Sequence, residues 1–238
     1  MVYNGSIMKH NHMKNPVHLK FAVLATDVAL FTVRDNTLLV RLISVNRPPF
    51  FVNQLGLPGG LIDPRETAEE AVKRHIEAKA LVSSEKIYIE QLYTFSEIER
   101  DPRGRVVAVA YLALVPWGRL SEAEQSDENG ARWIPVDNAR NLAYDHDKIL
   151  LVAENRLRSR VTYTTLMSKL LPKEFTLTEM EQAYESVAHT ELDKRNFRKK
   201  ILKLKIIQPL HKKRTDGAHR PAELYKFTSE KVKEIEVL

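Results

Sequence analysis

The spacing of hydrophobic and polar residues divides the chain into two parts. Residues 19–45 are rich in β-branched and aromatic side chains and are interrupted at Asp35-Asn36, which predicts two strands joined by a turn. The same reading predicts strands at 86–95, 105–115 and 131–135, and helices at Thr67–Ala80 and 146–158. We therefore expect an α+β domain over residues 19–155, with a mixed sheet between helices, after a flexible leader of residues 1–18.

From residue 160 to residue 238 the pattern changes to short helices followed by two strands. Residues 161–172 read as a helix closed by Pro172. Thr178 and Glu181 have the spacing of a capping box and predict a helix over 178–189.

Asp193 is the predicted cap of a third helix, in which Phe197, Ile201 and Leu204 form an apolar stripe. The segments IIQPLH and ELYKFT predict two strands, joined by the basic loop KKRTDGAHRPA. Three helices and a basic hairpin in this order predict a winged helix-turn-helix domain.

Composition excludes several classes of protein. Hydrophobic residues make up 43% and charged residues 29% of the chain, which is ordinary for a soluble globular protein. Because there is no cysteine, disulfides and thiolate zinc sites are impossible, and we expect a reducing, cytoplasmic location. No apolar run approaches the ~20 residues that cross a bilayer, and the first 18 residues lack the apolar core of a signal peptide. We therefore expect no membrane partner.

The excess positive charge lies in the last third of the chain. Residues 1–159 have 20 basic and 20 acidic side chains, whereas residues 160–238 have 17 and 11. Within residues 194–220, eleven lysines and arginines stand against a single acid, Asp216. This clustering predicts double-stranded DNA as a partner, although a solvated basic face gives the same count. RNA binding is permitted by the charge, but the aromatic platform motifs of single-stranded RNA readers are missing.

The third helix and the basic loop supply the expected DNA contacts. At the start of the helix we expect Arg195, Asn196 and Arg198 to contact base edges. His219 is a further candidate in the wing. The side chains expected on phosphates are Lys194, Lys199, Lys212, Lys213, Arg214 and Arg220.

Residues 56–82, GLPGGLIDPRETAEEAVKRHIEAKALV, resemble the Nudix box of hydrolases that act on nucleoside diphosphates linked to another group. The positions that match the box are Gly60, Glu66, Arg74, Ile76 and Val82. The box requires glutamates where this chain has His75, Ala78 and Lys79, and a glycine where it has Leu81. We expect Glu66 and Arg74 to be the structural part of the frame, paired across the loop.

The three missing glutamates remove the metal-binding chemistry of the box. Positions 75, 78 and 79 share one helix face, where carboxylates would hold Mg²⁺ against a pyrophosphate. Lys79 repels the cation that a glutamate attracts. We therefore expect no metal, no cofactor and no catalytic residue: this domain binds its ligand without hydrolysing it. The alternative is a working hydrolase with displaced metal ligands, for which Glu69, Glu70 and Glu77 are the candidates, although they lie on another face.

The resemblance extends over about residues 18–230. The segment QLYTFSEIERDPRGRVVAVAYLALVP resembles the one that follows the box in ADP-ribose-directed Nudix proteins, and the whole chain is similar to the Nudix-related transcriptional regulators of bacterial NAD metabolism. The resemblance implies a homodimeric repressor that binds a palindromic operator and releases it when ADP-ribose or a related nucleotide binds. A sister group of the same architecture senses pentoses such as arabinose, so the effector stays open.

Ligand-binding residues are expected around the box. The backbone of Gly59 and Gly60, and the cations Arg41, Lys79, Arg100 and Arg105, are expected near phosphates. Tyr93 and Phe95 are expected near a base, with strand core as the alternative role.

Overall fold

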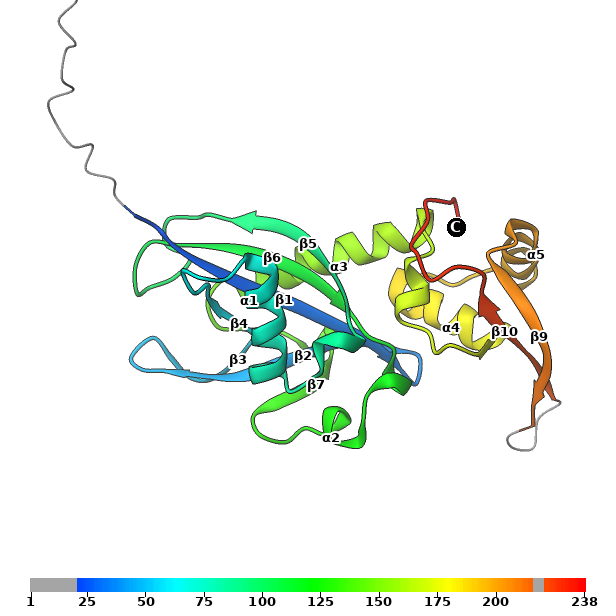
Figure 1. Cartoon of the computed structure of the whole chain (residues 1–238), viewed down its shortest axis with the longest axis horizontal. Helices are drawn as coiled ribbons and strands as arrows, with labels where there is room; N and C mark the ends of the chain where they lie inside the picture. The colour runs from blue at the N-terminus through cyan, green and yellow to red at the C-terminus, as the bar shows by residue number, and fades with distance from the viewer. Residues whose placement is uncertain (1–20, 216–220) are drawn as a thin grey trace, which may run out of the picture.

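The computed structural model describes residues 21–215 and 221–238 (Figure 1). The expected leader and the wing residues His219 and Arg220 lie outside the described residues. No helix in the described ranges is both long and apolar enough to cross a membrane.

The N-terminal part is built on one mixed sheet. Its strands are β1 (Val23–Arg34), β2 (Thr37–Arg47), β3 (Phe51–Gly56), β4 (Gly59–Leu61), β5 (Tyr88–Phe95), β6 (Val106–Leu114) and β7 (Ala131–Pro135). The central order is β3-β2-β1-β6-β5, with β4 paired to β1 and β7 paired to β2. Strands β1 and β6 are parallel, and the other pairs are antiparallel.

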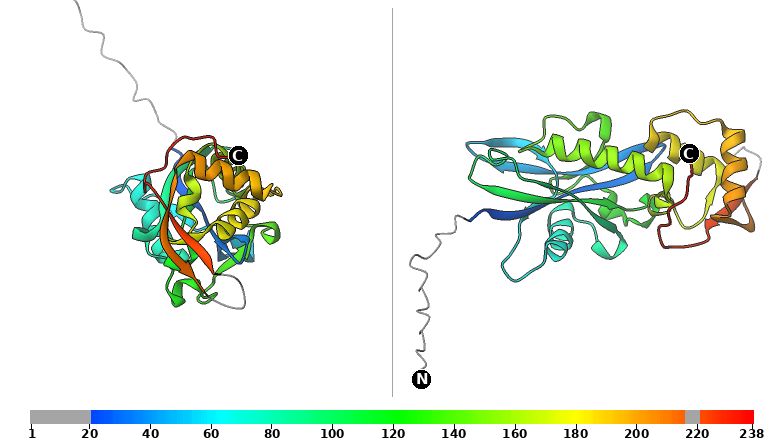
Figure 2. Two further views of the ribbon diagram at one scale, coloured as in Figure 1. Left: turned by 90° about the vertical axis from the view of Figure 1, so that its right-hand side faces the viewer. Right: turned by 90° about the horizontal axis from the view of Figure 1, so that it is seen from above.

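Helices cover both faces of this sheet, as expected (Figure 2). Alternate residues of β1 enter two separate cores: Val28 and Leu30 pack on the side of α1 (Ala68–His75) and η1 (Ile76–Ala80), and Ala29 and Phe31 on the side of α3 (His146–Tyr163). The period of two along the strand therefore specifies a two-sided core. Shorter helical segments are η2 (Ser84–Lys86), η3 (Trp117–Arg119), α2 (Glu122–Gln125) and η4 (Val136–Asn138).

The turn between the first two strands confirms the sequence prediction. Asp35 and Asn36 both have positive φ, at 48° and 60°, which is the backbone of a two-residue hairpin loop. Gly59 and Gly60 are the first two residues of the short strand β4. Gly59 faces Asp27 in the ladder, and a Cβ there would lie 2.3 Å from Asp27 Oδ1, so only glycine allows this close pairing.

The C-terminal part has the predicted winged helix-turn-helix order. It contains η5 (Leu166–Lys169), β8 (Phe175–Thr176), α4 (Leu177–Ala188), α5 (Lys194–Leu204), β9 (Ile207–Arg214) and β10 (Ala222–Phe227). The three strands form a small sheet of order β8-β10-β9. Asp193 caps α5 by accepting from the Asn196 amide, and Phe197 and Ile201 are buried. The predicted third helix and its apolar stripe are therefore confirmed.

Two details of this part differ from the prediction. The capping box that starts α4 is Thr176 with Glu179, not Thr178 with Glu181, because Thr176 is the residue with extended backbone before the helix. Thr178 and Glu181 have the same spacing but lie inside the helix. The expected helix over 161–172 is also absent: α3 continues to Tyr163, and a 3₁₀ turn over Leu166–Lys169 follows.

Helix α3 joins the two parts (Figure 1). It runs without a break through residues 155–160, where the sequence suggested a boundary. One hydrophobic cluster contains Leu112 of the large sheet, Leu157 of α3, and Tyr184 and Phe197 of the winged helix. The junction is therefore a packed interface.

Candidate ligand pocket and nucleic-acid interface

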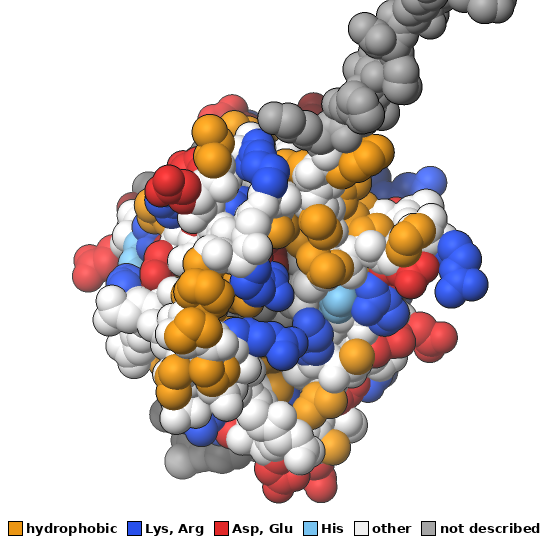
Figure 3. Space-filling model, turned by 90° about the vertical axis from the view of Figure 1, so that its left-hand side faces the viewer, with side chains coloured by type: hydrophobic (Ala, Val, Ile, Leu, Met, Phe, Trp, Pro, Cys, Tyr) orange, Lys and Arg blue, Asp and Glu red, His pale blue; other side chains and the backbone are white. Residues whose placement is uncertain are grey.

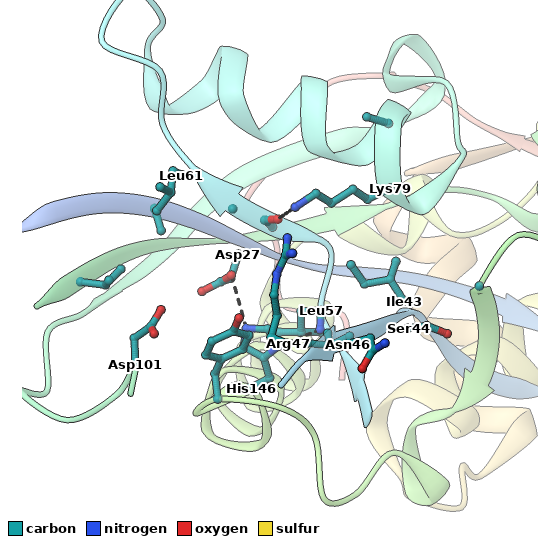
Figure 4. Close-up of a pocket in the computed structure, with 18 of the residues that line it drawn as sticks. Asp27, Ile43, Ser44, Asn46, Arg47, Leu57, Leu61, Lys79, Asp101 and His146 are labelled. Atoms are coloured by element: carbon teal, nitrogen blue, oxygen red, sulfur yellow. Dashed lines mark hydrogen bonds and ion pairs between the residues drawn. The ribbon is translucent and has the colours of Figure 1, made fainter. Parts of the chain in front are cut away.

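A cleft of about 610 Å³ opens between the start of β1, the end of β2, strand β4 and the end of η1. Two further segments complete it: the loop that contains Arg100–Arg103, and the start of α3, where Tyr144 precedes the helix and His146 is its first residue. Figure 4 shows the polar side chains that converge on it from these elements, among them Asp27, Arg47, Lys79 and Asp101.

A buried ion-pair network forms the floor of the cleft. Arg100 donates from Nη2 to Asp145 Oδ1 at 2.7 Å and to Asp27 Oδ2 at 2.9 Å, and from Nε to Asp145 Oδ2 at 3.0 Å. All three side chains are at most 8% exposed. Burial disfavours the charged form of Arg100, but the two carboxylates outweigh it and raise its pKa.

His146 fixes the other side of Asp27. Its Nδ1 accepts the Leu57 amide hydrogen at 2.9 Å, so the ring proton is on Nε2, which lies 3.4 Å from Asp27 Oδ1. Burial alone would raise the pKa of Asp27, but His146 and Arg100 hold it below its ordinary value. Asp27 is therefore an ionised carboxylate with a partner at each oxygen, Arg100 at Oδ2 and His146 at Oδ1.

Three cations stand above this floor. Lys79 donates to the Gly59 carbonyl oxygen, which holds its ammonium at β4 (Figure 4). Arg103 forms a two-pronged ion pair with Asp101 and lies 5.4 Å from the centre of the Tyr144 ring. The Arg47 side chain is exposed and makes no hydrogen bond or ion pair with the described residues. Burial lowers the pKa of Lys79, and the nearby Arg47 lowers it further, so these two cations act on the same space.

Two of the three positions that hold metal in a Nudix box face the pocket here, and the third, His75, is buried beside them. Ala78 and Lys79 line the cleft, and a Cβ on Gly60 would lie 2.9 Å from both Lys79 Nζ and His75 Cε1. Burial, followed by Lys79 and Arg74, lowers the pKa of His75, which keeps the imidazole neutral. A neutral ring beside an ammonium replaces the expected carboxylates. Because Gly60 has no side chain, it leaves room for His75 and Lys79. A neutral imidazole beside an ammonium is not a suitable ligand set for a divalent cation.

The candidate replacement carboxylates do not reach the cleft. Glu70 accepts from the Thr67 amide and hydroxyl as part of the capping box, Glu77 binds Ser84, and Glu69 pairs with Lys73 at 3.0 Å. Among the described residues, the cleft has no cluster of three side chains that could hold a metal ion.

The structure contains the expected pair between Glu66 and Arg74. Arg74 donates from Nε to Glu66 Oε2 at 2.9 Å and from Nη2 to Glu66 Oε1, and it also binds the Leu61 carbonyl oxygen at 3.1 Å. The hydrogen bonds from Arg74, followed by the Asp63 amide, lower the pKa of Glu66 to about 2. This pair joins the loop to α1.

Four of the eight expected ligand residues line the cleft, namely Gly59, Gly60, Lys79 and Arg100. The other four lie elsewhere. Arg105 donates to the Glu97 carbonyl oxygen outside the cleft. Tyr93 and Phe95 lie on β5, an edge strand on the far side of β6, where Phe95 is in the core and Tyr93 is exposed. The alternative role as strand core holds for Phe95.

Arg41 is the most deeply buried of these displaced residues. The alternation of β2 directs its side chain toward η1, where Nε donates to the Ala80 carbonyl oxygen at 3.0 Å and Nη1 to the Ser126 carbonyl oxygen at 2.8 Å. Its guanidinium lies 5.2 Å from the Trp133 ring centre. Arg41 therefore stabilises the C-terminal end of the box helix.

Nine polar residues that line the cleft were not among those named from the sequence: Asp27, Ser44, Asn46, Arg47, Asp101, Arg103, Asn129, Tyr144 and His146. Asp27 had a usable signal, since it is a lone acid within an apolar strand. Arg103 stands in the quoted DPRG turn. Tyr144 precedes α3 and His146 is its first residue, and their distance along the chain from the box gave no indication of contact.

The exposed cations of the C-terminal part lie at the end of the molecule opposite the cleft. Helix α5 and the β9-β10 hairpin face outward together (Figure 2). The side chains of Lys194, Arg195 and Lys199 on α5 and of Lys213 on β9 are exposed and make no hydrogen bond or ion pair with the described residues. This surface fits a phosphate backbone.

Within the described residues, the side chains of the other four expected DNA contacts bind groups of the protein itself. Arg198 pairs with the buried carboxylate of Glu181 through two hydrogen bonds and also donates to Thr178 Oγ1 at 3.2 Å. Asn196 Nδ2 donates to the capping Asp193 at 2.8 Å. Arg214 binds Glu179, and Lys212 lies 3.8 Å from Glu174. The contacts of Arg198 and Arg214 join α5 and the wing to α4.

Comparison with known proteins identifies the family. The family model of the Nudix domain matches residues 23–152, and that of the NrtR DNA-binding winged helix domain matches residues 167–227. The ADPR responsive transcriptional repressor NtrR of Acinetobacter baylyi is 30% identical over 207 residues, which is 86% of this chain and 82% of that protein. The chain belongs to the Nudix-related transcriptional regulators.

Two further relatives are a regulator crystallised with DNA and a hydrolase. The crystal structure of Shewanella oneidensis NrtR complexed with a 27mer DNA is 31% identical, with a TM-score of 0.75 over 86% of this chain and 93% of that chain. An ADP-ribose pyrophosphatase of Methanocaldococcus jannaschii is 32% identical over 149 residues, which is 62% of this chain and 82% of that enzyme. The N-terminal part thus resembles a regulator and also a hydrolase.

Proposed function

We propose that this protein is a DNA-binding transcriptional repressor whose Nudix domain binds ADP-ribose, or a closely related nucleotide, without hydrolysing it. Residues 19–155 form the sensor and residues 160–238 the DNA-binding unit. ADP-ribose binding releases the operator. The observation that carries the proposal is Lys79 on the former metal face of the cleft, in the same chain as an outward-facing basic helix.

The charge of the cleft fits a diphosphate better than a neutral sugar. Four cationic side chains line it, Arg47, Lys79, Arg100 and Arg103. Arg100 is paired with Asp27 and Asp145, and Arg103 with Asp101, whereas Arg47 and Lys79 have no carboxylate partner among the described residues. These two unpaired cations suit a pyrophosphate with one negative charge on each phosphate. Tyr144 offers an aromatic face beside Arg103. A pentose such as arabinose needs no such cations, so we favour the nucleotide over the sugar.

The DNA half is supported by the exposed cations of α5 and β9 and by the relatives. A related repressor is described as ADPR responsive, and the Shewanella oneidensis relative was crystallised with DNA. We infer that this chain binds a palindromic operator as a homodimer, because winged helices read one half-site each. The cytoplasmic location expected from the lack of cysteine stays a prediction.

Operator release tests the whole proposal. The full-length protein is titrated onto a labelled duplex from its own promoter region, and ADP-ribose, NAD and arabinose are then added separately to the complex. ADP-ribose should lower the affinity, whereas arabinose should not. Release by arabinose alone would establish the pentose sensor in its place.

Hydrolysis is tested separately. ADP-ribose incubated with the protein and Mg²⁺ or Mn²⁺ should stay intact by chromatography, because the metal face holds His75, Ala78 and Lys79. The Methanocaldococcus jannaschii relative makes this test necessary. Steady release of AMP and ribose 5-phosphate, abolished by Glu70→Gln or Glu77→Gln, would show that displaced carboxylates support catalysis.

A further inference from the structure

A second group of metal-ligating side chains lies away from the cleft, where the sensor meets the winged helix. Asp137 is in η4, Glu154 is in α3, and His189 is the residue that ends α4. One ligand atom from each lies within 4.8 Å of the others, and His189 Nε2 is 3.8 Å from Asp137 Oδ1. It is the one such group among the described residues.

The three side chains differ in how strongly the surrounding structure restrains them. Glu154 is the fixed member, since its side chain is 11% exposed and Arg158 donates to its Oε1. A carboxylate has a second oxygen, so Arg158 can keep its hydrogen bond as an outer-shell partner while the other oxygen binds an ion. Asp137 and His189 are 69% and 38% exposed, which leaves them free to adjust.

We propose that Asp137, Glu154 and His189 bind one late first-row transition-metal ion, with Zn²⁺ as the best fit, at the junction of the sensor and the DNA-binding domain. One imidazole and two carboxylates supply nitrogen and oxygen ligands that Zn²⁺ accepts, and a water molecule would complete a tetrahedral set. Ligands at about 2 Å from Zn²⁺ lie roughly 3.3 Å apart, so the two exposed side chains need to move inward by about an ångström. Mg²⁺ and Ca²⁺ prefer six or more oxygen ligands and fit poorly.

The place of the site gives the ion a role. His189 has left-handed backbone, with φ of 48°, and starts the turn that leads to α5 at Lys194. An ion held there links the helix-turn-helix turn to η4 and α3 of the sensor. Zn²⁺ should therefore stabilise the docked arrangement of the two domains.

Zinc titration of the chelator-treated full-length protein tests the site by calorimetry and thermal unfolding. The background variant is His10→Gln/His12→Gln, because the leader sequence HNH also offers imidazoles. In this background one Zn²⁺ should bind per chain and raise the melting temperature. His189→Gln and Asp137→Asn should each weaken binding at least about tenfold, the scale at which even outer-shell changes are felt.

The controls separate loss of a ligand from loss of the fold. His211→Gln alters another exposed histidine, on β9, and should keep the parental Zn²⁺ affinity. The melting temperatures of the zinc-free variants should match that of the zinc-free background. Zinc affinity unchanged in His189→Gln and Asp137→Asn, or a background chain that takes up no Zn²⁺, would overturn the site. Neither result depends on DNA or ADP-ribose binding.

Discussion

The cleft and helix α5 both present lysine and arginine, but they hold them in opposite ways. In the cleft, Arg100 is buried between two carboxylates and Lys79 is bound to the Gly59 carbonyl oxygen. On α5, Arg195 and Lys199 stand in solvent with no partner among the described residues. Figure 3 shows the end of the molecule opposite the winged helix, where lysine and arginine side chains gather near the centre and hydrophobic side chains border them.

The difference follows from the size of the partner. A small anion gains affinity from cations that are already positioned, because the entropy of ordering them was lost on folding. A DNA backbone offers many phosphates, so mobile surface cations suffice, and their binding releases counterions. Positive charge therefore identifies a site for an anion. Whether the cations are held by the protein or free in solvent indicates whether that anion is small or a long polymer.

The largest expected effect is the loss of stability when the buried ion-pair network under the cleft is disrupted. Arg100→Ala leaves Asp27 and Asp145 buried without a counterion, and should reduce the free energy of unfolding by about 3–5 kcal/mol in a urea titration. Arg105→Ala, which removes an exposed arginine with one backbone contact, is the control and should change little. Equal losses of unfolding free energy in the two variants would mean that the buried network contributes no more to stability than an exposed arginine does.

Two arginines of the same helix sharpen the comparison. Arg195→Ala should weaken operator binding by about 1–3 kcal/mol and relax base preference, with the melting temperature unchanged. Arg198→Ala should instead reduce stability by about 1–3 kcal/mol, because it leaves the buried Glu181 carboxylate without its partner. Base contact by Arg198 stays a prediction, and a variant of unaltered stability that loses base preference would favour it.

Lys79→Glu tests the preorganised cation of the cleft. A carboxylate beside the pyrophosphate should weaken ADP-ribose binding by about 1–3 kcal/mol, measured by calorimetry in EDTA. The parent should bind equally well with and without EDTA, because the ammonium replaces a divalent ion. Operator affinity without ligand should stay parental, since the substitution is in the other domain. Parental affinity of the variant for ADP-ribose would show that Lys79 takes no part.

The smallest effect concerns one exposed cation of the wing. Lys213→Ala should weaken binding to all duplexes similarly and reduce the slope of log affinity against log salt by about one unit. Gel-shift titrations at several salt concentrations measure it.

Residues 1–159 alone should bind no duplex. Binding as tight as that of the whole chain would show that the DNA contacts lie in the N-terminal part.

The sequence alone determined the architecture. Period-two strands, the Asp35-Asn36 hairpin, the apolar stripe of α5 and the order of the winged helix depend on local propensity and spacing, and all appear in the structure. The departures at His75, Ala78 and Lys79 were also legible, because the box has fixed spacing along one helix face. Local rules failed where two candidates were equivalent: Thr176 and Thr178 each precede a glutamate by three residues, and backbone geometry at Thr176 decides between them.

Only the tertiary structure decided which side chains meet. Asp27, Arg100 and His146 come from three distant segments, and packing alone brings them to one floor. The same holds for Arg41, which the alternation of β2 turns toward η1, and for Arg198, whose partner Glu181 is on the preceding helix. Charge is visible in a sequence, but whether a cation is buried, paired or free depends on contacts between residues far apart in the chain.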